Sequence, residues 1–127
     1  MKHIFISLSI CISTSLYAQS YFSYFTGDTT DVNTDADYGI CLMGGSTEDD
    51  RAMKWFLEKA NGGDIIVIRA SGSDGYNDYF FSELDVEVNS VETIVFNNDD
   101  AANDSYVLQQ IANAEAIWIA GGDQSVY

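Results

Sequence analysis

The chain has 127 residues, a length that fits one domain, and 46% of them are hydrophobic, enough for a substantial core. Its formal net charge at pH 7 is −15, with only five lysines and arginines. Because no basic stripe is available to neutralise phosphates, this composition excludes a nucleic-acid-binding protein. An acidic surface suits a soluble exported protein, and it also suits a cationic substrate or calcium.

Residues Met1–Ala18 have the features of a secretory signal peptide. Lys2 gives a positive start, Ile4–Ile12 is apolar, and Ala18 is a small residue before a cleavage point at Gln19. The segment is too short and too rich in serine for a helix that spans a membrane. We therefore expect a secreted or periplasmic protein that has no membrane contact once residues 1–18 are removed.

Removal of this segment changes the chemistry that remains. His3 is the single histidine, and Cys11 leaves with it, so that Cys41 is the one thiol left. Cys41 lies in an apolar run, which predicts a small buried side chain without a disulfide partner. Without a histidine, residues 19–127 cannot by themselves form a Ser-His-Asp triad, a Cys-His pair or a histidine zinc site.

The next segment, residues 19–37, is polar and predicts a flexible acidic leader. The spacing of Asp31, Asn33 and Asp35 is similar to the start of a calcium-binding EF-hand loop. The positions that need glycine and glutamate in such a loop hold other residues, so an acidic linker is the favoured interpretation.

Residues 38–127 alternate between apolar runs and helical patterns. The runs that predict buried strands are Tyr38–Met43, Ile65–Ile68, Val91–Phe96 and Ala116–Ala120. The stripes with helical spacing are Met53, Phe56, Leu57 and Ala60, then Tyr76, Tyr79, Phe80 and Leu84, then Val107, Leu108, Ile111 and Ala114. This alternation predicts an α/β fold: a parallel sheet with right-handed crossovers, equal to part of a doubly wound domain.

Helix ends follow from capping residues and glycines. Ser46 is expected to cap the first helix, with Asp49 in the capping-box position. Asn103 or Asp104 is expected to cap the last helix, and Asn61–Gly63 is expected to end the first one.

All four predicted strands end at one edge of the sheet, where open α/β sheets bind ligands. Ser71, Gly72, Ser73 and Asp74 follow the second strand as a loop of small residues. This loop does not match Gly-x-Ser-x-Gly and has no base, so it is either a substrate-lining loop or a plain turn. Arg69, just before it, could hold a carboxylate or pair with a nearby acid.

Gly121, Gly122, Asp123 and Gln124 follow the fourth predicted strand. Backbone N–H groups there could bind an oxyanion or a substrate, with the Gln124 amide as a further hydrogen-bonding group. An equally good interpretation is a tight turn into a helix with Asp123 as its N-cap.

A resemblance favours the functional interpretation. The sequence resembles the cyanophycinase and related exopeptidase family of serine peptidases over about residues 38–127. The matching segments are Leu42–Gly45, Ala52–Leu57, Gly62–Asp64, Arg69–Tyr79 and Ala120–Gln124.

The resemblance implies a flavodoxin-like fold of the class I glutamine-amidotransferase type, helices on both faces, and no cofactor or metal. It implies an incomplete domain, with four strands present and the catalytic serine and histidine beyond Tyr127. By the same resemblance Gly121–Gln124 would line the substrate site, with the Gly122–Asp123 backbone in the oxyanion hole. From its place after the second predicted strand, we also assign Ser71–Asp74 to the substrate site. Ser46 replaces a third glycine of many relatives.

The sequence therefore predicts an exported serine-type exopeptidase that hydrolyses a peptide or polyamide substrate through an acyl-enzyme. A cationic substrate would suit the acidic surface. The chain by itself would be inactive and, with an exposed apolar fourth strand, poorly soluble. A non-catalytic binding module that kept the fold is the alternative. A phospho-acceptor receiver domain, suggested by Asp49–Asp50 and Asp99–Asp100, is a poorer alternative because these acids lie past the strand ends.

Overall fold

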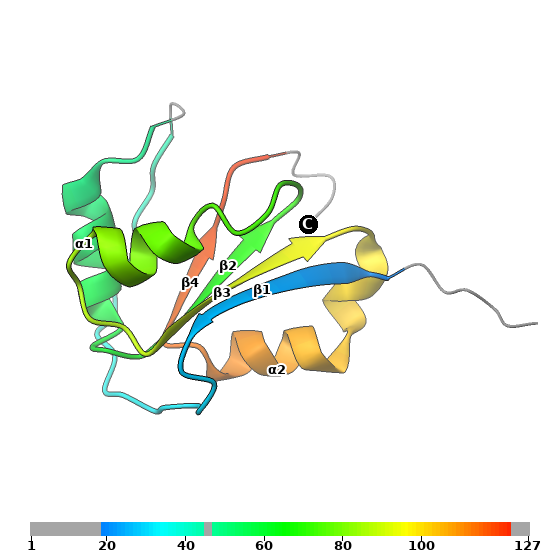
Figure 1. The fold of residues 1–127 in the computed structure, drawn as a ribbon, viewed down its shortest axis with the longest axis horizontal. Helices are drawn as coiled ribbons and strands as arrows, with labels where there is room; N and C mark the ends of the chain where they lie inside the picture. Colours follow the sequence, from blue (N-terminus) through cyan, green and yellow to red (C-terminus); the bar gives the residue numbers. More distant parts are fainter. Residues whose placement is uncertain (1–18, 45–46, 123–127) are drawn as a thin grey trace, which may run out of the picture.

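The computed structural model describes residues 19–44 and 47–122, which form one mixed four-stranded sheet with helices on both faces (Figure 1). The strands are β1 (Tyr21–Gly27), β2 (Asp64–Arg69), β3 (Ser90–Phe96) and β4 (Ala116–Ile119), in the spatial order β1-β3-β2-β4. Strands β3, β2 and β4 are parallel, and β1 pairs antiparallel with β3. The predicted α/β class is confirmed, and the arrangement is consistent with a flavodoxin-like fold.

Two layers of helix cover the sheet. The helix α1 (Asp50–Lys59) and the π-helical turn η1 (Tyr79–Glu83) lie on one face, where Met53, Leu57 and Phe80 are fully buried against β2. The helix α2 (Ser105–Asn113) and the 3₁₀ turn η2 (Asp99–Asn103) cover the opposite face (Figure 1).

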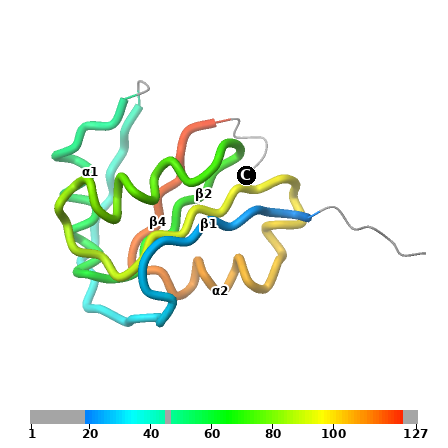
Figure 2. Tube along the Cα trace, in the orientation of Figure 1, coloured from blue at the N-terminus to red at the C-terminus, as the bar shows by residue number. Residues whose placement is uncertain are grey.

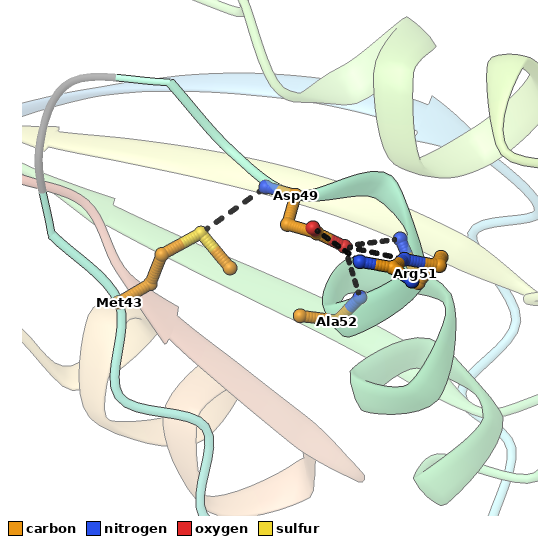
Figure 3. Close-up of polar contacts among 4 residues, drawn as sticks. All are labelled: Met43, Asp49, Arg51 and Ala52. Atoms are coloured by element: carbon orange, nitrogen blue, oxygen red, sulfur yellow. Dashed lines mark hydrogen bonds and ion pairs between the residues drawn. The ribbon is translucent and has the colours of Figure 1, made fainter.

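The N-terminus of α1 is capped by Asp49 (Figure 3). Its carboxylate accepts hydrogen bonds from the backbone N–H groups of Arg51 at 3.0 Å and Ala52 at 3.3 Å, and it also pairs with the Arg51 side chain. This satisfies two of the donors that a helix start leaves free. The predicted cap, Ser46, lies outside the described residues, and the helix begins later than that prediction required.

The helix α2 is capped by Asp104, one of the two residues predicted for that role. Its predicted stripe is only partly buried: Val107 is fully buried, whereas Leu108 is 50% exposed. The helix is therefore packed on the sheet through a narrower face than the spacing indicated.

The prediction of an irregular leader over residues 19–37 is wrong for its first part. Tyr21–Gly27 forms β1 and pairs along its whole length with β3. Four aromatic residues give this segment a strong strand preference, and β3 offers it an open edge. From Asp28 to Asp37 the chain has no helix or strand, as predicted.

The prediction of a strand over Tyr38–Met43 is also wrong. The structure gives these residues no strand, because β4 pairs directly with β2 and takes the neighbouring position. In the tube of Figure 2 the chain after β1 first crosses the start of the parallel strands, where Asp28 bonds to Asn89, and then passes on the β4 side of the sheet. Cys41 and Met43 pack partly against the core, while Tyr38, Ile40 and Leu42 stay exposed.

The amino-terminal segment 1–18, predicted as a signal peptide, lies outside the described residues. Among residues 19–44 and 47–122, no helix combines the length and apolarity that crossing a membrane requires.

Candidate functional site at the carboxyl edge of the sheet

A cleft of about 790 Å³ lies where β2 and β4 end. It is lined by Ile117–Gly121, which lie on and just after β4, and by the Gly39–Gly44 segment. Arg69 and Tyr76 also line it. The predicted meeting of strand ends at one edge is thus confirmed for β2 and β4, with residues 39–44 present as a loop rather than a strand.

Arg69 is held by the loop that follows β2. Its Nη1 atom donates a hydrogen bond to the Ser73 carbonyl at 3.1 Å, and its guanidinium lies 5.4 Å from the centre of the Tyr76 ring. The Nε atom is buried and has no hydrogen-bond partner. Among the described residues Arg69 forms no ion pair with a carboxylate.

The close approach of this guanidinium depends on Gly72. Its φ of +95° lies in the left-handed region, and a Cβ atom there would stand 2.8 Å from Nη2 of Arg69. Only glycine accepts both the backbone angle and the contact without a shift of its neighbours. The loop of small residues therefore has a structural role in fixing Arg69.

Tyr76 and Trp118 form the aromatic floor of the cleft, with ring centres 6.3 Å apart. The Tyr76 hydroxyl donates to the Glu48 carboxylate, and burial together with this hydrogen bond raises the pKa of Tyr76. The indole Nε1 of Trp118 is buried, and no acceptor lies in hydrogen-bonding geometry around it. Its position near Tyr76 partly opposes the rise in the pKa of Tyr76.

Two buried donors, Arg69 Nε and Trp118 Nε1, thus belong to side chains that line the same cleft and lack acceptors. A buried donor without a partner costs free energy, and a ligand oxygen would remove that cost. The cleft is therefore suited to a ligand that carries a carboxylate or carbonyl group.

Only some of the predicted site residues line the cleft. Gly121 lines the cleft, whereas the side chains of Ser71, Ser73 and Asp74 are exposed and none of them lines it. Gly122 follows at the end of the described chain. Asp123 and Gln124 lie outside the described residues.

Sequence reasoning missed Trp118 and Glu48 as site residues. Trp118 stands in a predicted strand, and the strand pattern gave no sign that its indole N–H would lack a partner. The sequence pattern placed Glu48 only as an acid near the start of a helix.

In the described part of the chain, no group of three or more His, Cys, Asp or Glu residues is placed to hold a metal ion.

We compared the chain with models of protein families, with curated proteins and with solved structures, and none of them matched.

Proposed function

We propose that this chain supplies the substrate-binding edge of an exported serine-type exopeptidase of the cyanophycinase-like kind. Such an enzyme hydrolyses a peptide or isopeptide bond through an acyl-enzyme intermediate. Residues 19–127 contain no histidine, so they cannot supply a serine–histidine pair by themselves.

The observation that carries the proposal is the position of Arg69. An exopeptidase must recognise a chain end, and a guanidinium with a free donor edge is the side chain best suited to a terminal carboxylate. Arg69 lines the cleft, its side chain makes one hydrogen bond to the described residues, and its Nε remains a buried donor without a partner.

The cleft supports the rest of this role. Gly121 offers backbone close to the bound chain without a side chain in the way, and Trp118 and Tyr76 give flat surfaces for a substrate side chain. The acidic surface of the chain favours the approach of a substrate with cationic side chains.

Binding tests this role directly. In calorimetric titration of the purified chain, we expect an N-acetylated dipeptide with a free carboxylate to bind at least about tenfold more tightly than its C-terminal amide, a difference of about 1.4 kcal/mol. Arg69→Gln should remove this preference. Arg51→Gln, which takes the same charge from an exposed side chain outside the cleft, should leave it unchanged.

Equal binding of acid and amide would contradict the proposal. Catalysis is tested separately, by reading the coding DNA beyond the Tyr127 codon and assaying the encoded protein on the same dipeptides. A Gly-x-Ser-x-Gly segment followed by a histidine, with hydrolysis of the free acid, supports the peptidase. Binding by a protein that lacks both favours the alternative, a non-catalytic binding module.

A further inference from the structure

Glu92 is a carboxylate in the middle of the sheet. It lies on β3 between Phe25 of β1 and Ile66 of β2, on the face that α2 covers, and it is 1% exposed. Its neighbours on that face of β3 and β2, Ile94 and Ile66, belong to the apolar core under α2. A carboxylate at such a position is costly unless its oxygens are hydrogen-bonded or paired with a cation.

Only one oxygen of Glu92 is satisfied. Oε1 accepts hydrogen bonds from the Ser23 hydroxyl and from the Tyr106 hydroxyl, the latter at 2.8 Å. Oε2 is buried and has no hydrogen-bond partner. Two donors on one oxygen fix the orientation of the carboxylate and leave the other oxygen for a partner that the described residues do not supply.

A cavity of about 190 Å³ adjoins this carboxylate, between the sheet, α2 and the Asp28–Asp31 loop. A cavity needs only about 10–15 Å³ to hold one water molecule, so this one can hold a ligand of several heavy atoms. None of the described residues that line it is a lysine or an arginine. Apart from Glu92, the lining side chains that carry carboxylate or amide oxygens are Asp28, Asp31, Asp64, Gln109, Gln110 and Asn113.

We propose that this cavity binds a small organic cation, a guanidinium or a primary ammonium group, through Glu92. The carboxylate provides the opposite charge in a low-dielectric place, and the amide oxygens of α2 accept the remaining N–H groups. The apolar side chains of Phe25 and Ile66, which also line the cavity, cover the carbon part of the ligand.

An organic cation fits better than a metal ion. Asp64 is already used by the protein: its Oδ1 accepts from Asn89 and Ser90, and its Oδ2 accepts from the Val32 backbone N–H at 3.1 Å. No group of three acids in the described chain is arranged for metal coordination. A guanidinium or ammonium needs one carboxylate and several oxygen acceptors, which is what the cavity offers.

This cavity is separate from the cleft at Arg69. Asp64 and Ser90, the first residues of β2 and β3, line it, so it lies at the opposite end of the parallel strands from the carboxyl edge. The proposal therefore does not depend on the peptidase function.

The test is an NMR titration of the purified chain with methylguanidinium chloride and with methylammonium chloride. N-methylurea, a neutral molecule of nearly the same shape, and sodium chloride at equal ionic strength are the reference titrations. We expect saturable shifts of backbone amides around Glu92, Asn113 and Asp31 with either organic cation, and at least about tenfold weaker binding of N-methylurea.

Variants decide whether Glu92 is responsible. Glu92→Gln keeps the shape and removes the charge, and we expect at least about tenfold weaker binding of the cation. Glu87→Gln removes the same charge from an exposed residue and should leave binding unchanged. Asp31→Asn, in the loop that lines the cavity, gives a second measurement should Glu92→Gln fail to fold, with a smaller loss expected.

Three outcomes would overturn the proposal. One is the absence of saturable shifts, which means that the cavity holds water only. Another is equal binding of N-methylurea and methylguanidinium, which means that charge has no part in recognition. The third is binding of calcium chloride at this cavity without binding of either organic cation.

Discussion

The hydroxyl of Tyr106 donates a hydrogen bond of 2.8 Å to Glu92, and this contact joins the first turn of α2 to the central part of the sheet. The Tyr106 ring also stacks on Tyr21 of β1, with ring centres 5.9 Å apart and planes within 5°. One side chain therefore links a helix to two strands that are distant in sequence.

Loss of the Tyr106 hydroxyl should destabilise the fold. In Tyr106→Phe the carboxylate of Glu92 keeps only Ser23 as a donor, so we expect a loss of about 1.5–3 kcal/mol in the free energy of unfolding. Urea denaturation followed by circular dichroism measures it. Tyr38→Phe, at a residue that is 89% exposed, should change stability little, and equal effects of the two variants would contradict this account.

Alkaline pH should weaken the fold through the same residue. Burial, reinforced by Glu92, raises the pKa of Tyr106 from its usual 10.0 to about 12. The folded state therefore holds this proton more tightly than the unfolded state, and the stabilisation is full below pH 10 and is lost as the pH rises toward about 12. Ultraviolet titration of tyrosinate should show one late-ionising tyrosine fewer in Tyr106→Phe than in the wild type.

Asn77 should be essential for the packing of the helical turn that leads into η1. It is 3% exposed, donates to the Tyr24 carbonyl at 3.0 Å and to the Thr26 hydroxyl at 3.2 Å, and accepts from the Thr93 hydroxyl at 2.7 Å. Asn77→Ala removes the partner of Thr93, which is buried, and of Tyr24 and Thr26, which are partly buried, so we expect a loss of about 2–4 kcal/mol. Asn33→Ala, at an exposed position, is the control, and a loss of under about 1 kcal/mol at Asn77 would contradict the prediction.

Replacement of Gly72 should affect both the stability of the fold and the binding of a ligand at Arg69. Alanine at Gly72 meets both a φ of +95° and the Arg69 guanidinium, whereas alanine at Gly62 meets a φ of +80° with nothing within 4 Å. We expect Gly62→Ala to lower stability by about 1 kcal/mol. Gly72→Ala should cost at least as much and also weaken binding of the dipeptide acid, and unchanged binding would show that Arg69 does not depend on this loop.

The edge strand β4 should drive self-association. It ends the sheet on one side, and Ile119 is 65% exposed there. Ile119→Lys places a charge on this edge, so we expect fewer aggregates by light scattering at equal concentration. Leu108→Lys removes a similarly exposed aliphatic side chain from α2 and should help less. A wild-type chain that stays monomeric and melts cooperatively would contradict the prediction.

The parallel centre of the fold could be predicted from the sequence because its strands are largely apolar: Ile65–Ile68 is apolar throughout, and Val91–Phe96 is interrupted only by Glu92 and Thr93. Ile65–Ile68 and Val91–Phe96 can be buried on both faces only in a sheet covered by helices, and β2 and β3 are such strands. The edges could not be predicted in this way. An apolar run such as Tyr38–Met43 shows that a segment is able to pair, and does not show whether another strand takes the neighbouring position.

The candidate sites, too, could be predicted from the sequence only in part. The loop after Arg69 could be placed at the strand ends from the pattern alone, but the direction of the guanidinium depends on Gly72 and Ser73, which the pattern does not resolve. Nothing in the sequence pattern indicates that Glu92 is buried, because a single acid within a strand usually faces solvent. Its burial follows from the pairing of β1 with β3, which was not predicted.

If residues 1–18 are a signal peptide, the early start of β1 bears on when they can be removed. The carbonyl groups of Gln19 and Ser20 already accept hydrogen bonds from Asn97, at 3.0 Å and 2.8 Å. A signal peptidase needs the residues on both sides of the cleaved bond extended in its own cleft. If cleavage falls before Gln19, it must therefore precede the docking of β1, and a molecule that folds before it is processed would keep its leader.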